Sequence, residues 1–121
     1  MKLKKIKIGI KDLKSALNDF EKTGEAIERG EMIKEETGVY FTSFEAFRKA
    51  LTPKRLELLR IIKAKKPSSI NELARMINRD IKNVADDVKY LGQMGLIEKI
   101  ETNRKIAPTI DYDRISLEIA V

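Results

Sequence analysis

The hydrophobic positions of residues 68–97 form two helical patterns separated by a short break. Apolar side chains recur three or four positions apart over residues 69–78, which places them on one face of a helix. Ser69 and Glu72 have the spacing of a capping box, in which each side chain accepts a hydrogen bond from a free amide at the helix start. The first pattern therefore predicts a short helix that packs through Ile70, Leu73, Ala74 and Ile77.

The second pattern predicts a longer helix that begins near Asp80, a favoured N-cap residue, and ends at about Met94. Gly95 follows, and glycine readily adopts the positive φ at which many helices end. Two helices joined by a turn of three or four residues form a helix-turn-helix. The apolar face of the second helix is expected to consist of Val84, Val88 and Leu91.

A β-hairpin is predicted directly after this pair of helices. Residues 97–100 and 105–110 are expected to form two strands, joined by a polar turn at residues 101–105. A hairpin in this position is the wing of a winged helix-turn-helix. Another helix is predicted upstream, with Thr52 as its N-cap and Pro53 as its first residue, and it should run to about Lys65. Its apolar residues lie on two sides, so the N-terminal segment or a second protomer must cover one of them.

The ends of the chain alternate between apolar and polar residues. Residues 1–10 are typical of a half-buried strand, and residues 115–121 of a second one that pairs with it or with a partner chain. Between them, residues 12–29 show the amphipathic spacing of a helix, and residues 39–41 suggest a short strand. Ser43 should cap a helix whose Phe44, Phe47 and Leu51 point into the core.

These elements predict a mainly α fold with a β-wing, in the α+β class: a winged helix-turn-helix with an N-terminal strand-helix extension and a C-terminal strand. We expect residues 1–42 to form the extension, used for packing or dimerisation, and residues 43–121 to form the winged domain. A chain of 121 residues is long enough to bury one substantial core.

Five segments of the chain carry a resemblance to a known group of proteins. The region from Val39 onward resembles the winged helix-turn-helix of MarR- and ArsR-like transcription regulators, and more narrowly a group of small archaeal and bacterial DNA-binding proteins. Some members of that group lie beside toxin genes and have been called antitoxin-like. The resemblance implies DNA binding, transcription regulation and a homodimer. The segments are LTPKRLELL (51–59), SINELA (69–74), NRDIKNV (78–84), GLIE (95–98) and YDRISLEI (112–119).

Composition narrows the function classes further. The net charge of +6 and the isoelectric point near 9.5 favour nucleic acid or another acidic partner. Cysteine and histidine are both absent, which removes disulfides and the commonest metal ligands and general base. No catalytic motif is found, so we expect neither an enzyme nor a metal or cofactor site. No apolar run approaches the length of a membrane span, and we expect a cytoplasmic protein.

The residues expected to contact double-stranded DNA lie on the second helix, beside it and on the wing. Asn83 can bind adenine through two hydrogen bonds, and Lys82 can reach guanine or phosphate. Arg79 in the turn is a candidate phosphate ligand, and Ser69 could hold a phosphate at the start of the first helix. The remaining candidates are Lys89 on the second helix and Arg104 and Lys105 at the wing tip.

The charge of the second helix keeps an alternative open. Arg79, Lys82 and Lys89 are balanced by Asp80, Asp86 and Asp87, and a carboxylate in the groove more often repels phosphate than reads a base. A different class of function would be a protein-interaction module, in which residues 12–36, acidic from Asp19 onward, contact a toxin or a subunit of the transcription machinery.

Overall fold

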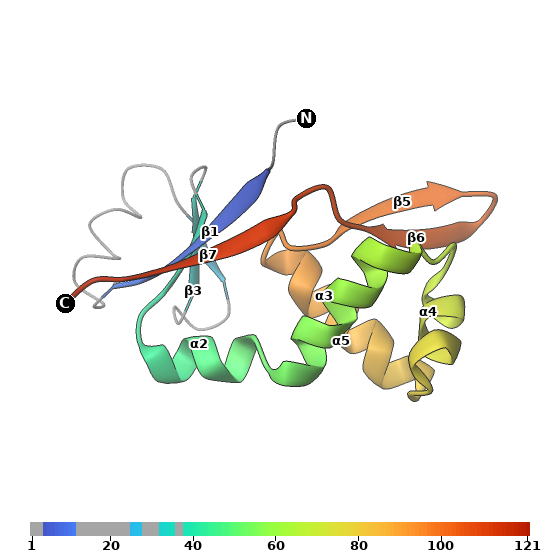
Figure 1. The fold of residues 1–121 in the computed structure, drawn as a ribbon, viewed down its shortest axis with the longest axis horizontal. Coiled ribbons are helices and arrows are strands. Elements are labelled where there is room, and N and C mark those ends of the chain that lie inside the picture. Colours follow the sequence, from blue (N-terminus) through green and yellow to red (C-terminus); the bar gives the residue numbers. More distant parts are fainter. Residues whose placement is uncertain (1–3, 12–24, 28–31, 36–37) are drawn as a thin grey trace. The chain divides into compact units, whose positions relative to one another are not determined.

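The computed structural model describes residues 4–11, 25–27, 32–35 and 38–121 (Figure 1). Contacts within the chain separate it into two units. The first, here called the sheet unit, combines residues 1–52 with residues 112–121; the second, the helical unit, is Pro53–Asp111. This division differs from the expected boundary at residue 43, because the helix before Pro53 and the last strand both belong with the N-terminal strands.

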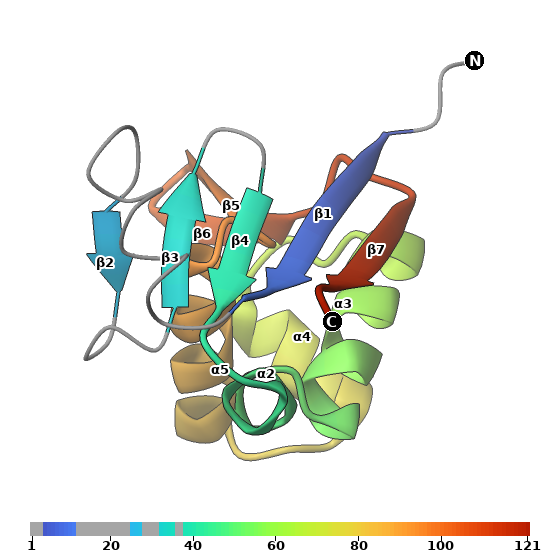
Figure 2. The same ribbon diagram turned by 90° about the vertical axis from the view of Figure 1, so that its left-hand side faces the viewer.

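A five-stranded mixed sheet forms the sheet unit, with the strand order β2-β3-β4-β1-β7 (Figure 2). β1 is parallel to both of its neighbours, β4 and β7, whereas β2, β3 and β4 are antiparallel in sequence. The pairing of β7 with β1 shows that the two ends of the chain join within one protomer. The strands are β1 (Lys5–Ile10), β2 (Glu25–Ile27), β3 (Met32–Glu35), β4 (Gly38–Phe41) and β7 (Arg114–Ile119).

One face of this sheet carries the core of the unit. Ile8 and Ile10 of β1 are buried beside Val39 and Phe41 of β4, their partners in the parallel register. The helix α2 (Phe44–Ala50) packs on β4, where the rings of Phe41 and Phe47 meet edge to face with centroids 5.8 Å apart. Ser43 caps α2 as predicted, since its Oγ accepts a hydrogen bond from the Ala46 amide at 3.1 Å.

Two expectations for the sheet unit were wrong. Phe44 is half exposed rather than part of the core, because it begins α2 and its ring contacts only the side of Phe47 among the aromatic rings described. Residues 25–27 form a strand rather than the end of a helix, because they pair antiparallel with β3, a strand that the periodicity did not predict. The rest of the helix expected over residues 12–29 lies outside the described residues.

Three helices and a hairpin form the helical unit, in the order expected from the sequence: α3 (Pro53–Lys65), α4 (Ile70–Ile77), α5 (Ile81–Gln93), β5 (Glu98–Thr102) and β6 (Lys105–Thr109). α3 and α4 both contact β6, and α4 contacts α5. The predicted core residues Leu73, Val84, Val88 and Leu91 are fully buried. With four helices and seven strands among the described residues, the fold is α+β with more strand than expected. No described helix has the length and hydropathy needed to cross a bilayer.

Gly38 allows β4 to approach β1. Its φ is +155°, and a Cβ at this position would lie 2.2 Å from the carbonyl oxygen of Lys7. We predict that Gly38→Ala lowers the free energy of unfolding by roughly 2 kcal/mol or more, because both the clash and the backbone conformation oppose a side chain. Urea unfolding followed by circular dichroism measures the change.

Gly92 provides a control of opposite sign. It lies inside α5, where an added Cβ would meet its nearest atom at an ordinary distance of 3.7 Å. Gly92→Ala should therefore stabilise the helical unit by about 0.5–1 kcal/mol. Equal stabilities of the two variants would contradict the account of Gly38.

Candidate nucleic-acid interface

Local capping fixes the two helices of the helix-turn-helix. Ser69 Oγ accepts from the Glu72 amide at 3.0 Å, and Asp80 accepts from the Asn83 amide at 3.2 Å, so both predicted N-caps are confirmed. Asn78 ends α4 in the left-handed conformation, with φ 53° and ψ 52°. Asparagine tolerates this conformation better than most residues, which allows the chain to turn within three residues.

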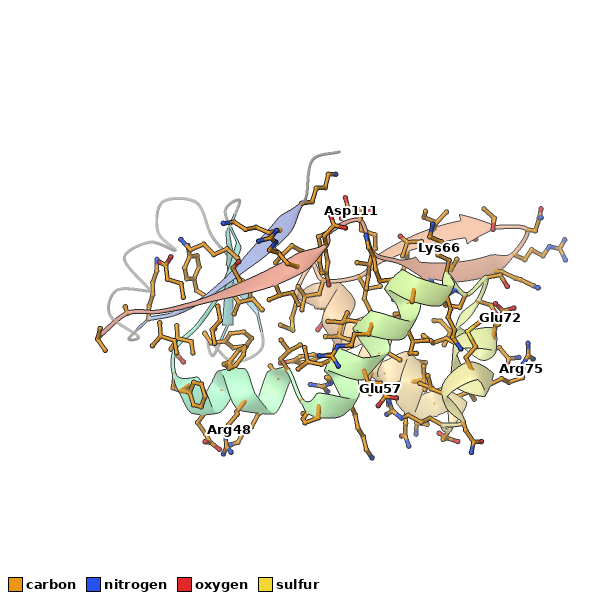
Figure 3. The ribbon with its side chains drawn as sticks, in the orientation of Figure 1. Arg48, Glu57, Lys66, Glu72, Arg75 and Asp111 are labelled. Atoms are coloured by element: carbon orange, nitrogen blue, oxygen red, sulfur yellow. The ribbon has the colours of Figure 1, made fainter. Side chains whose placement is uncertain are left out.

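The start of α4 already holds a carboxylate. Glu72 accepts hydrogen bonds from the amide of Ser68 at 3.1 Å and from its hydroxyl at 3.2 Å. The carboxylate thus reaches the residue before the N-cap, one position earlier than a capping box predicts. Ser69 caps the helix. Glu72 lies at α4, and Arg75 extends outwards from this helix (Figure 3). A phosphate at Ser69 would have to displace or approach Glu72, so the structure gives Ser69 a capping role.

Asp87 links three parts of the helical unit. Its Oδ1 accepts from Arg55 Nε of α3 at 3.1 Å, and its Oδ2 accepts from Arg79 Nη2 of the turn at 2.9 Å. The side chains of Asp87, Arg55 and Arg79 are only 15%, 21% and 24% exposed. One carboxylate therefore holds α3, the turn and α5 together, and we call these three residues the Asp87 cluster.

The Asp87 cluster changes the roles expected for two residues. Arg79 was predicted to bind phosphate, but its Nη2 donates to Asp87, and its Nη1 is buried without a hydrogen-bond partner among the described residues. Asp87 had no explanation in the sequence and now has a structural one. Tyr90 also joins this region, since the Arg55 guanidinium lies 4.2 Å from the centroid of its ring.

The opposite face of α5 is exposed. Lys82, Asn83, Asp86 and Lys89 all point to solvent, three or four residues apart, as the helical spacing predicted. The two lysines form no ion pair with any described residue. Ile81, at the first position of the helix, is exposed as well. Its apolar side chain can contact a thymine methyl group in a major groove.

Lysines from α5 and the wing meet in a shallow pocket. The pocket has a volume of about 340 Å³ and is lined by Lys89, Gly92 and Gln93 of α5 together with Ile97 and Lys99. Lys99 crosses over Gly92, where its Cε would lie 3.8 Å from an added Cβ. Neither lysine is paired within the described chain, so both ammonium groups are available to an anion.

The wing tip is a two-residue turn. Thr102 and Lys105 pair across it, and the two residues between them, Asn103 and Arg104, have φ values of 46° and 65°. Positive φ at both central positions defines the type I′ turn that matches the twist of a hairpin. Glycine is the usual second residue of this turn, so Arg104 occupies a position that disfavours its side chain. Arg104 and Lys105 are both exposed, as the sequence predicted.

Most of the basic charge of the chain belongs to the helical unit. It contains 13 lysine and arginine residues against 8 aspartate and glutamate residues, which gives +5 of the total of +6. Three of the carboxylates, Glu72, Asp80 and Asp87, are occupied by caps or by the Asp87 cluster. On the exposed face of α5 the remaining carboxylate is Asp86, beside two lysines that form no ion pair with residues the structure describes.

Comparison with known proteins now places the chain. Residues 50–117, more than half of the chain, match the HVO_A0114 family. The chain belongs to the HVO_A0114 family. Among solved structures, it resembles the crystal structure of the predicted DNA-binding transcriptional regulator from E. coli, with a TM-score of 0.50 and 24% identity over 57% of this chain and 74% of that one. No curated protein matches the sequence.

This likeness shows a winged-helix-like fold for the HVO_A0114 protein and leaves its site to be built from its own residues. Of the seven candidates, Lys82, Asn83 and Lys89 share one exposed face of α5, and Arg104 and Lys105 lie at the wing tip. Ser69 and Arg79 are engaged in a cap and an ion pair. Ile81, Lys99 and Arg55 were not predicted from the sequence. The alternation of Lys99 with Ile100 in the wing strand could have indicated that Lys99 is exposed.

We predict that Asp87→Asn lowers the free energy of unfolding by roughly 2–3 kcal/mol, because it removes the negative charge to which two largely buried guanidinium groups are hydrogen-bonded. Asp86→Asn is the matched control: it makes the same chemical change one residue earlier, at an exposed side chain, and should alter stability by less than about 0.5 kcal/mol. Chemical unfolding of both variants tests this, and equal losses would contradict the assigned role of Asp87.

Proposed function

We propose that this HVO_A0114 protein is a sequence-specific DNA-binding transcription regulator that acts as a homodimer and has no catalytic activity of its own. The observation that carries the proposal is a set of exposed cations on α5 and the hairpin, two parts of one unit, that form no ion pair with the described part of the chain: Lys82, Lys89, Lys99, Arg104 and Lys105. Their arrangement suits a polyanion with a groove. In this proposal the protein is of the MarR- or ArsR-like kind, with antitoxin-like proteins as its relatives.

In the proposed complex, α5 enters the major groove with its N-terminal residues against the base edges. Asn83 is suited to adenine, because its side-chain amide is free while its backbone amide binds Asp80. Ile81 would contact thymine methyl groups, and Lys82 would bind guanine or a phosphate. The Asp87 cluster keeps α5 fixed relative to α3, so these side chains are presented by a rigid support.

The hairpin would follow the sugar-phosphate backbone. Lys89 and Lys99 line one pocket from two elements, so a single phosphate could contact both ammonium groups. Arg104 at the tip can reach a phosphate or the minor groove. These contacts fix the position of the protein and contribute affinity for any sequence, whereas Asn83 and Ile81 would provide the discrimination between sequences.

Titration against a labelled fragment of the gene's own upstream region, with a scrambled fragment as control, tests this function. With about four phosphate contacts per protomer, the logarithm of the binding constant should fall with the logarithm of the salt concentration with a slope near −7. Asn83→Ala should weaken binding to the specific fragment by about 1–3 kcal/mol and leave binding to the scrambled fragment nearly unchanged.

Arg60→Ala is the control variant, since Arg60 is an exposed residue of α3 and the change removes one charge without touching α5 or the hairpin. It should leave both affinities close to those of the wild type. Failure of the wild-type protein to bind either fragment at low salt would refute the proposed function and direct attention to a protein partner of residues 12–36.

Asp86 gives a separate prediction of opposite sign. It lies four residues from Lys82 and three from Asn83 and Lys89, on the same exposed face, and its carboxylate should repel the phosphates beside the groove. Asp86→Asn should therefore tighten DNA binding about fivefold or more at low salt, without a change in stability. Unchanged affinity in fluorescence anisotropy would show that this face of α5 does not approach DNA.

A further inference from the structure

The last strand of the sheet unit has one hydrogen-bonding edge without a neighbour among the described strands. β7 follows β1 at the end of the strand order, and within the described part of the chain it pairs with β1 alone, over six residues in continuous register (Figure 2). The amides of Arg114 and Ala120 donate to the carbonyls of Lys4 and Ile10 in that pairing. Because backbone groups alternate in direction along a strand, the amides and carbonyls of Ile115, Leu117 and Ile119 point away from β1.

The apolar face of the sheet continues to this edge. Leu117 and Ile119 are in register with Ile8 and Ile10, and so share the face that α2 covers at Phe41. Ile8 and Ile10 are 0% and 7% exposed, whereas Leu117 and Ile119 are 43% and 50% exposed. The apolar side chains of this face are therefore buried on β1 but remain exposed to solvent on β7.

The other face of β7 carries one charge of each sign. Arg114 and Glu118 lie four residues apart on either side of Ser116, and all three are on the same face because side chains alternate in a strand. Glu118 binds Lys7 of β1 at 3.3 Å but remains 69% exposed, and Arg114 has no ion-pair partner among the residues described. Proteins often protect an open edge with proline, bulges or charged side chains. β7 has neither a proline nor a bulge, and its two charges are of opposite sign.

We propose that β7 pairs with β7 of a second copy of this chain, antiparallel and centred on Ser116. In this register Arg114 of each protomer lies opposite Glu118 of the other, which gives two ion pairs related by the two-fold axis. Ile115 lies opposite Leu117 of the other protomer, and their outward backbone groups form the hydrogen bonds of the ladder. The five-stranded sheets of the two protomers become one sheet.

Charge selects this register over its neighbours. Only shifts by an even number of residues keep the outward backbone groups opposite each other and the apolar side chains on one face. A centre on Glu118 would bring two carboxylates together, and a centre on Arg114 two guanidinium groups. A centre on Leu117 leaves both charges without a partner of opposite sign. The charge pattern of β7 is complementary to that of a second, antiparallel β7. For this reason the proposed partner strand belongs to a second copy of this chain rather than to another protein.

The proposal specifies the surface of the homodimer included in the proposed function, and charge reversal without DNA tests it. In sedimentation velocity over a concentration series, Arg114→Glu and Glu118→Arg should each raise the dimer dissociation constant by about tenfold or more, because each places like charges opposite at two positions. The double variant should restore the dimer. An equimolar mixture of the two single variants should also restore it, since both pairs are then of opposite sign.

Two controls keep the test decisive. Glu45→Arg makes the same charge change on α2, at a residue that pairs only locally with Arg48, and should leave the dissociation constant unchanged. In the unmodified protein, the amides of Ile115, Leu117 and Ile119 should exchange with deuterium more slowly as the concentration rises into the dimer range. This second measurement needs no variant to fold.

The proposal would be overturned if the wild-type chain stayed monomeric at high concentration. It would also be overturned if the wild-type protein, the single variants, the double variant and the mixture all formed dimers with the same dissociation constant. Either result leaves DNA binding open, because a monomer can still bind DNA through α5 and the wing. A dimer with the expected charge pattern but no affinity for DNA would refute the regulator function and retain the β7 interface.

Discussion

The bonds between Asp87 and two arginines are the constraint on which the proposed DNA-binding surface depends. α5 is held from one side by Val84, Val88 and Leu91, which are fully buried and contribute apolar burial, a stabilising effect without a direction of its own. Hydrogen bonds from Arg55 and Arg79 to the two oxygens of one carboxylate add direction, since each fixes a distance between α5 and another element. In the proposed complex with DNA, α5 must keep its side chains within a fraction of an ångström of their positions, and this link would supply that restraint.

The same link divides the charges of the helical unit into two groups with different uses. Arg55, Arg79 and Asp87 are largely buried and neutralise one another in part, whereas Lys82, Lys89, Lys99 and Arg104 are unpaired within the described residues. A count of charges along α5 suggests near neutrality and weak attraction to DNA. Once Asp80 is assigned to the helix cap and Asp87 to its arginines, the exposed face of the helix keeps two lysines against Asp86. The net charge of the exposed face of α5 is therefore more positive than the count of all charged residues along the helix suggests.

The elements of the helical unit could be predicted because they are encoded locally. Ser69, Asp80 and Gly95 mark helix ends through their own chemistry, and the apolar spacing of α4 and α5 defines their buried faces. The site was predicted only in part, since the exposure of Lys82, Asn83 and Lys89 follows from periodicity but the burial of Arg79 does not. Arg79 binds Asp87, which is eight residues further along the chain. Asp87 also binds Arg55 of α3, which is 32 residues before Asp87 in the sequence. In the sheet unit, β2 and β3 depend on pairing between strands, and three or four residues carry too little pattern to show it.

The wing tip shows how a local cost can indicate a use. A type I′ turn with arginine at its second central position places a long side chain at φ 65°, where glycine would be free of strain. The neighbouring strands do not require it, because the hairpin pairs in register from Glu98 to Thr109 and would do so around Asn-Gly as well. A residue that weakens its own turn is expected to contribute elsewhere, and an exposed guanidinium at the end of a hairpin has little to contact within its unit. In the proposed complex with DNA, contact with a phosphate would account for both the position of Arg104 and its departure from the preferred turn sequence.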